Sequence, residues 1–220
     1  MHPSGIQKRF GAYLPHWTRE RGIYAVRFRL GDSLPQTTLK ELQRERAEIL
    51  RAAGTRNITG QERLRLLELH GKAIERFLDN GRGACWMQRP EIAAIVAGAL
   101  RHFEPVRYRL FAWCVMPNHM HVVVQPCRGH ALSDILRSWK GFSAREANRI
   151  LGRSGAFWQP ECYDRLIRTS DELYHHIGYA WINPDVAGLK DWRWRWKMPE
   201  GELQAFLRSP ESPWNEEDRS

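Results

Sequence analysis

A His-x-His pair is the part of this sequence best suited to chemistry. His119 and His121 follow Asn118 at the start of an apolar run. Side chains two positions apart on a strand project from the same face, with Cα atoms roughly 6.5–7 Å apart, so two imidazoles could share one cation. Histidine is the commonest transition-metal ligand, and such a strand would leave a third ligand to another element. The alternative is a pair of structural histidines at a strand end.

A tyrosine and an asparagine stand in a later segment with helical spacing. Tyr179 and Asn183 are four residues apart, which places a hydroxyl and an amide oxygen on one face of a helix. From the residues alone, the better interpretation of Tyr179 is a core residue of an amphipathic helix. Asn183 could equally cap the end of that helix before Pro184.

Alternating polar and apolar residues predict the strands that must position these side chains. The predicted strands are 22–30, 106–115, 119–125 and 163–168. The first should be half-buried, with Arg27 on its less apolar face. Only Met116, Pro117 and Asn118 separate the second strand from the third, so these two should pair as a hairpin.

Apolar residues at helical spacing predict helices between and after the strands. The predicted helices are 37–50, 61–78, one that opens at Pro90, 132–151 and 171–182, with Pro184 ending the last. Strands interspersed with helices predict an α+β domain, in which helices pack on a mainly antiparallel sheet.

The chain divides into three expected parts. Residues 1–21 mix glycine, proline and charge without periodicity and should form an N-terminal arm. Residues 22–190 should form a single domain, in which 37–78 is a helical insertion after the first strand. Residues 191–220 should form a C-terminal tail, basic and tryptophan-rich at its start and acidic, without regular structure, over 209–220.

Composition points to nucleic acid and away from membranes. The 220 residues carry a formal net charge of +9 and include ten tryptophans, and cations hold phosphates while rings stack on bases. No stretch approaches the ~20 apolar residues that span a bilayer, and the N-terminus lacks the apolar core of a signal peptide. The four cysteines form no CxxC pair, which excludes a zinc ribbon. We therefore expect a cytoplasmic protein.

Four sequence blocks in series resemble one family of bacterial enzymes. The blocks read WCVMPNHMHVVVQP, WKGFSAREAN, GAFWQPECYDRLIR and YAWINPDVAGL. They resemble the REP-associated tyrosine transposases, which are single-tyrosine HUH transposases, and the resemblance covers about 22–30 and 90–190. It implies a ferredoxin-like sheet, with His119 and His121 as metal ligands, Tyr179 as nucleophile and Asn183 as third metal ligand.

The resemblance implies a single-stranded DNA endonuclease and strand transferase. A divalent ion, Mg or Mn, would stabilise charge developing on a phosphodiester while Tyr179 attacks it. The product would be a 5′-phosphotyrosine link and a free 3′-OH, which conserves bond energy for rejoining. The implied partner is hairpin or single-stranded DNA of the REP-like kind. The resemblance further implies a monomer associated with the bacterial nucleoid.

Further residues are candidates for DNA contact. Lys140, Ser143 and Arg145 lie on the helix after the histidine strand and could hold phosphates, with solvated helix charges as the alternative. Trp158 and Gln159 could stack on and read a base, although Trp158 is equally well suited to the core.

The start of the tail offers a second candidate DNA surface. On an extended backbone, Trp192, Trp194 and Trp196 would share one face, with Arg193 and Arg195 on the other. Such a strip suits stacking and phosphate contact. The alternative is an edge strand whose tryptophans pack on the core.

Rival assignments remain open from the sequence. Tyr163 and Tyr174 are alternative nucleophiles, the first in a strand-like run and the second on another face of the late helix. A non-catalytic hairpin DNA-binding protein would share the charge and the aromatic residues. A metal hydrolase would hold zinc and a water nucleophile at His119 and His121, which would make Tyr179 dispensable.

Overall fold

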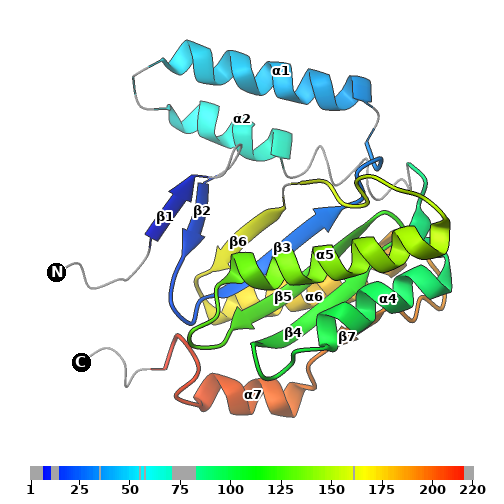
Figure 1. The fold of residues 1–220 in the computed structure, drawn as a ribbon. Coiled ribbons are helices and arrows are strands. Elements are labelled where there is room, and N and C mark those ends of the chain that lie inside the picture. The colour runs from blue at the N-terminus through cyan, green and yellow to red at the C-terminus, as the bar shows by residue number, and fades with distance from the viewer. Residues whose placement is uncertain are drawn as a thin grey trace.

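A five-stranded antiparallel sheet runs through the protein, whose computed structural model describes residues 7–10, 15–34, 36–54, 56, 58–70, 83–160 and 162–215. The strand order is β6-β3-β5-β4-β7 (Figure 1). The bounds are Tyr163–Ile167 for β6, Ile23–Arg29 for β3, His119–Pro126 for β5, Tyr108–Val115 for β4 and Arg195–Lys197 for β7. Every neighbouring pair is antiparallel, so the predicted α+β class is confirmed.

Four of the strands and two helices have ferredoxin-like topology. The chain runs β3, α4 (Pro90–Arg101), β4, β5, α5 (Leu132–Leu151) and β6. In the sheet, β3 lies between β6 and β5, and β4 lies on the other side of β5. Helices α4 and α5 cover the front of the sheet in Figure 1, and α6 (Ser170–Val186) covers the back. The predicted ferredoxin-like sheet is confirmed.

The β4–β5 hairpin places the His-x-His pair at a defined point of the sheet. Met116, Pro117 and Asn118 connect the strands, and the Met116 N–H donates to the His119 carbonyl over 2.8 Å. The register sets Cys114 opposite His121. The hairpin predicted from the sequence is confirmed.

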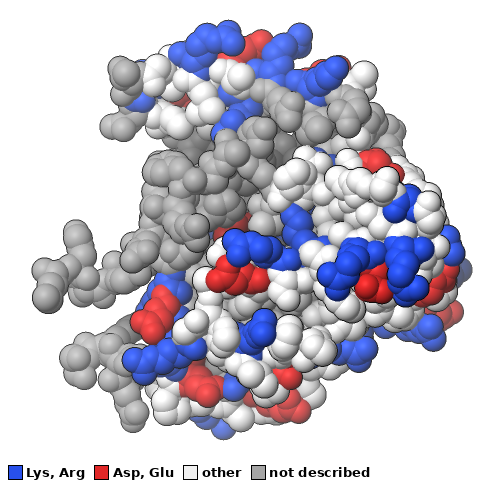
Figure 2. Space-filling model, viewed as in Figure 1, with Lys and Arg blue, Asp and Glu red and all other residues white. Residues whose placement is uncertain are grey.

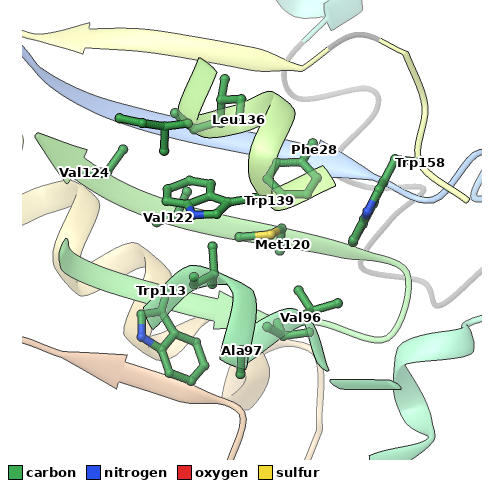
Figure 3. Packing of buried hydrophobic residues seen from close by; sticks show 14 of the residues in the cluster. Phe28, Val96, Ala97, Trp113, Met120, Val122, Val124, Leu136, Trp139 and Trp158 are labelled. Carbon is green, nitrogen blue, oxygen red and sulfur yellow. The ribbon is translucent and has the colours of Figure 1, made fainter. Parts of the chain in front are cut away.

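Alternation along β5 sends its side chains to two separate cores. Met120, Val122 and Val124 pack beneath α4 and α5, in the cluster shown in Figure 3. His119 and His121 alternate with them and therefore face the other side of the sheet, which α6 covers. Both faces of this central strand are buried.

The second core lies between the sheet and the two late helices. Leu173 and Ile177 of α6 and Phe206 of α7 (Glu200–Arg208) pack on the sheet residues Phe111 and Val123. The Phe111 and Phe206 rings meet edge to face, with centroids 4.8 Å apart. Across the described ranges, the structure contains no helix both long and apolar enough to cross a membrane.

Helices α1 (Gln36–Ala53) and α2 (Gly60–His70) form the helical insertion after the first domain strand. They lie above the sheet in Figure 1, outside its two helical layers. Arg65 of α2 pairs with Glu45 of α1 at 2.7 Å. The predicted helix 61–78 extends past His70 into residues outside the described part of the chain.

The N-terminal arm contains secondary structure that the sequence did not indicate. Strands β1 (Gln7–Phe10) and β2 (Pro15–Thr18) pair antiparallel as a separate two-stranded sheet. Each strand is only four residues long, too short for alternation to be visible as a period.

The structure of the C-terminal tail corrects the expected domain boundary. Strand β7 pairs with β4, with Trp196 opposite Trp113, so the domain does not end at 190. Helix α7 was not predicted, and the following residues 209–215 also pack on the domain. Glu211 pairs with Arg109, and Ser212 is buried. A three-residue strand and a nine-residue helix become stable only by packing on a sheet that is already formed.

Helix α6 also runs further than predicted. Pro184 lies inside the helix, which ends at Val186. A proline removes one backbone hydrogen bond, and here Pro184 is buried against the domain while the Ala187 N–H donates to the Asn183 carbonyl over 3.0 Å. Packing of this last turn offsets the lost bond.

Candidate active site

Side-chain hydrogen bonds fix the start of helix α6, which covers the histidine face of the sheet. The Thr169 hydroxyl accepts the Glu172 N–H over 3.1 Å, and the Glu172 carboxylate accepts the Arg168 N–H over 2.9 Å. Glu172 also binds Arg165 of β6 at 2.8 Å. These contacts tie the start of the helix to the edge strand of the sheet.

The two histidines of β5 lie side by side, with their ring nitrogens turned toward each other. His119 Nε2 is 3.0 Å from His121 Nε2, and the ring centroids are 4.9 Å apart. His119 Nδ1 donates to Asn118 Oδ1 over 2.7 Å. This bond holds the imidazole ring in place and leaves Nε2 as its unprotonated nitrogen. Asn118 therefore positions His119, a role that the sequence reasoning missed.

Both imidazoles are neutral at ordinary pH. Burial lowers the pKa of His119 to about 3, and Arg27 adds to the shift. Burial, followed by the neighbouring His119, lowers the pKa of His121 well below its usual value. Neutral imidazoles are the form that binds a metal, because each has one ring nitrogen without a proton.

Helix α6 brings Tyr179 and Asn183 to the same place. The Tyr179 ring meets the His121 ring edge to face, with centroids 5.2 Å apart. Asn183 follows one helical turn later and is 4% exposed. Its Oδ1 is buried and has no hydrogen-bond partner among the described residues. Among the described residues, no donor reaches this amide oxygen, which lies one helical turn from Tyr179.

The donor set fits a hard divalent ion. Two ligands at right angles, each about 2.1 Å from an octahedral ion, would be about 3.0 Å apart, which is the separation of the two Nε2 atoms. The buried Oδ1 of Asn183 adds an oxygen donor of the kind such ions prefer. Within the described ranges, the structure contains no group of three His, Cys, Asp or Glu side chains that could hold a metal.

Two arginines of β3 complete this face of the sheet, and the sequence reasoning missed their role. Arg27 lies opposite His121 and Arg29 opposite His119. Both are buried, so the expectation of a half-buried strand is wrong, because α6 covers the face that the sequence left open. The signal present in the sequence was the pair of arginines two residues apart, since this spacing places them on one face.

A third histidine lies near the pair. His176 is on α6, one turn before Tyr179, and adds to the lowering of the pKa of His121. Burial, followed by the adjacent His175, lowers the pKa of His176 itself to about 4. The sequence reasoning did not select His176, although its i, i−3 spacing from Tyr179 places both on one helix face.

Ser143 and Trp158 lie in the other core and cannot contact DNA as predicted. Trp158 Nε1 donates to Ser143 Oγ over 2.9 Å, and Ser143 Oγ donates to the Trp139 carbonyl over 2.6 Å. Trp158 packs edge to face on Phe28 at 4.7 Å, within the cluster beneath α5 (Figure 3). The sheet separates this cluster from the histidines.

Lys140 and Arg145 on α5 are also on the side away from the histidines, whereas Gln159 is joined to β3 by its backbone N–H, which donates to the Arg29 carbonyl over 2.9 Å. Lys140 Nζ donates to the carbonyls of Gln159 and Pro160 over 2.6 and 2.7 Å. Arg145 is exposed and lies 3.4 Å from Glu146. On the face with α4 and α5 that Figure 2 shows, cations stand among acidic residues rather than as one basic band.

The tryptophans of the tail pack on the protein, and the expected free stacking face is wrong. Trp192 Nε1 donates to the Val115 carbonyl over 2.7 Å, and Trp194 and Trp196 pack against the core. Arg195 binds Asp185 at 2.5 Å. Arg193 is exposed, with its guanidinium 4.6 Å from the Trp194 ring.

The rival tyrosines have other surroundings. Tyr174 donates to Glu200 Oε1 over 3.2 Å and accepts from Gln204 over 2.6 Å, so it joins α6 to α7. Tyr163 lies on β6 opposite Arg27, whose guanidinium is 5.4 Å from its ring centroid. Of the three tyrosines, Tyr179 has the ring contact with a site histidine.

Comparison with known proteins identifies the central part of the chain. Residues 89–166, which include the histidine pair, match the family described as "Transposase IS200 like". This segment is similar to the IS200-like transposases. Tyr179 and Asn183 lie beyond the segment that matches the transposase family.

A curated transposase shows the same relationship. The REP-associated tyrosine transposase of Escherichia coli (strain K12) is 28% identical over 89 residues, which are 39% of this chain and 52% of that protein. The match therefore spans about half the length of this relative. The resemblance to REP-associated tyrosine transposases that the four sequence blocks predicted is confirmed.

Two solved transposase structures resemble the fold distantly. One, a REP-associated tyrosine transposase bound to a REP hairpin, has a TM-score of 0.45 and 16% identity, covering 86% of this chain and 81% of that one. The other, a putative transposase from Deinococcus radiodurans R1, has a TM-score of 0.30 and 13% identity, covering 83% and 98%.

Proposed function

We propose that this protein cleaves and rejoins single-stranded or hairpin DNA through a tyrosine nucleophile. The observation that carries the proposal is the position of Tyr179. Its ring packs on His121, which forms a buried pair of neutral imidazoles with His119. The similarity of its central segment to a transposase family agrees with DNA as substrate. REP-like hairpins are the proposed targets, by analogy with the relatives' names.

The residues of this chain have distinct roles in the reaction. The Tyr179 hydroxyl gives up its proton as its oxygen attacks the phosphorus of a phosphodiester, and the bond from phosphorus to the 3′ oxygen breaks. The 3′ oxygen leaves and takes up a proton, and the 5′ strand end stays joined to the tyrosine. Attack by the 3′-OH of a second strand on this link reverses the step and releases the tyrosine.

His119, His121 and Asn183 would hold a divalent ion, Mg or Mn, whose charge would stabilise the negative charge that develops on the phosphate oxygens. The imidazoles suit this role because burial keeps them neutral. Asn118 suits a supporting role because it fixes the orientation of the His119 ring.

A single chain supplies the whole of the proposed site. The Tyr179 ring contacts His121 of the same chain, so the nucleophile can act in cis. This arrangement agrees with a monomer, and cleavage of chromosomal repeats would place the protein at the nucleoid. The exposed Arg145 and Arg193 stay candidates for DNA contact outside the site.

A covalent-adduct gel tests the proposal. Labelled hairpin DNA with single-stranded flanks is incubated with the protein and Mg²⁺ or Mn²⁺, and a labelled band should persist at protein size in denaturant. Tyr179→Phe should abolish the band and keep DNA affinity within a few-fold, because only the attacking oxygen is lost. Tyr174→Phe is the matched control on the same helix and should keep the band.

Other outcomes separate the rival functions. If cleavage gives no adduct and still occurs in Tyr179→Phe, the nucleophile is water and the protein is a metal hydrolase. Binding without cleavage in every metal would indicate a non-catalytic hairpin DNA-binding protein. Normal cleavage by His119→Ala or His121→Ala would show that the histidine pair is structural.

A further inference from the structure

Strand β3 carries two arginines into the buried space beneath α6. Arg27 is paired in register with His121 and Arg29 with His119. Directly opposed residues on neighbouring antiparallel strands have Cβ atoms about 4.5–5.5 Å apart and share one face of the sheet. The two arginines therefore share the face of the sheet that carries the two imidazoles, with Arg27 acting on both histidines and Arg29 next to Arg27.

Burial of these two cations is unusual. The exposed fractions are 6% for Arg27 and 9% for Arg29. Arg29 donates to the neutral hydroxyl of Ser33 over 3.0 Å, and none of the described carboxylates lies within ion-pair distance of it. Burial, followed by repulsion from Arg27, lowers the pKa of Arg29 to about 10, so it stays charged at neutral pH.

A buried cation without a matching anion lowers the stability of the free protein. For Arg29, an anion that enters this space would offset the cost. The planar guanidinium suits the oxygens of a phosphodiester, to which it can make two parallel hydrogen bonds.

We propose that Arg29, with Arg27 beside it, binds a backbone phosphate of single-stranded DNA next to the histidine pair. This inference rests on the proposed function and adds to it the residues that position the strand for Tyr179. The phosphate held by Arg29 would be the scissile one or its immediate neighbour, since His119 lies opposite Arg29 and next to His121. Arg29 is then a positioning residue for the proposed reaction.

A binding experiment without cleavage tests the inference. Arg29→Met removes the charge and keeps the length of the side chain, and Arg137→Met makes the same change at an exposed arginine of α5, paired with Asp134. Binding of a labelled single-stranded oligonucleotide of random sequence is followed by fluorescence anisotropy across a salt series in EDTA. Thermal unfolding of each free protein is measured in parallel.

We expect Arg29→Met to weaken binding by about tenfold at low salt, as loss of a charged hydrogen bond would. The plot of log affinity against log salt should flatten by about 0.7, which is the value for one lost phosphate contact on a single strand. The free variant should unfold at the same or a higher temperature, because an unmatched buried charge is gone. Arg137→Met should bind as the wild type does.

Two results would overturn the inference. One is wild-type affinity and salt dependence in Arg29→Met, and the other is an equal loss in Arg137→Met. A purely structural Arg29 would lower the unfolding temperature and leave the affinity of the folded protein unchanged. If Arg29→Met does not fold, Arg29→Gln, which keeps a donor for Ser33, undergoes the same measurements with the same expectations.

Failure of this inference is distinguishable from failure of the proposed function. An Arg29-dependent affinity in a protein that forms no adduct refutes the proposed function alone. Adduct formation in a protein whose Arg29 variant binds like the wild type refutes this inference alone.

Discussion

Acid should destabilise the metal-free protein through its buried histidine pair. The pKa of His119 is lowered from 6.5 to about 3, so the unfolded chain takes up a proton below pH 6.5 while the folded protein does not. Stability is therefore complete above pH 6.5 and decreases as the pH falls toward 3. His121 shifts in the same direction and adds to the loss.

The size of the loss follows from the pKa difference. Each pKa unit corresponds to about 1.4 kcal/mol, so His119 alone should lower the free energy of unfolding by about 2 kcal/mol between pH 7 and pH 5. Such a loss is a large fraction of the roughly 5–15 kcal/mol by which domains are stable. His121 should make the total larger than the value for one histidine.

Urea unfolding in EDTA at pH 7 and pH 5 measures the effect, because the chelator removes stabilisation by bound metal. The control is the double variant His119→Gln plus His121→Gln, which keeps the carboxylates and other histidines that titrate in this range. The wild type should lose at least about 2 kcal/mol more than the variant between these two pH values. An equal loss in both proteins would refute the argument that the pair is buried in its neutral form.

Three further predictions concern residues that the sequence assigned to a DNA-binding surface or to the C-terminal tail. The structure places most of them within the folded domain. Ser143→Ala should lower the free energy of unfolding by about 1–3 kcal/mol, because it leaves the buried Trp158 N–H without an acceptor, and should leave DNA affinity unchanged. In urea unfolding, Arg195→Ala should cost about 1 kcal/mol through its contact with Asp185, whereas the exposed Arg193→Ala should stay within about 0.5 kcal/mol. Phe206→Ala should cost about 3–5 kcal/mol, and a wild-type denaturation midpoint would show that α7 is not part of the cooperative domain.

Local patterns in the sequence predicted most of the central fold. Period-two alternation identified β3, β4, β5 and β6, and helical spacing identified α4 and the full extent of α5. These segments are long enough for their period to be visible, and each buries its own apolar face. The tail was mispredicted because β7 and α7 are short and depend on packing against the sheet.

The sequence by itself determined which residues could do chemistry. The spacing of His119 and His121 put both on one side of a strand, and that of Tyr179 and Asn183 put both on one side of a helix. These are consequences of backbone geometry within a single element. The resemblance to REP-associated transposases joined the two pairs into one proposed site.

Only the tertiary structure decided which face of the sheet each residue occupies. The period of a strand separates two faces but does not say which helix covers which, so α5 could not be assigned to the side away from the histidines. For the same reason, the sequence left Arg27 on an open face and did not place Arg29 opposite His119. Both arginines are buried because α6, which begins more than 140 residues after Arg27, covers the face of the sheet that they share with the histidines.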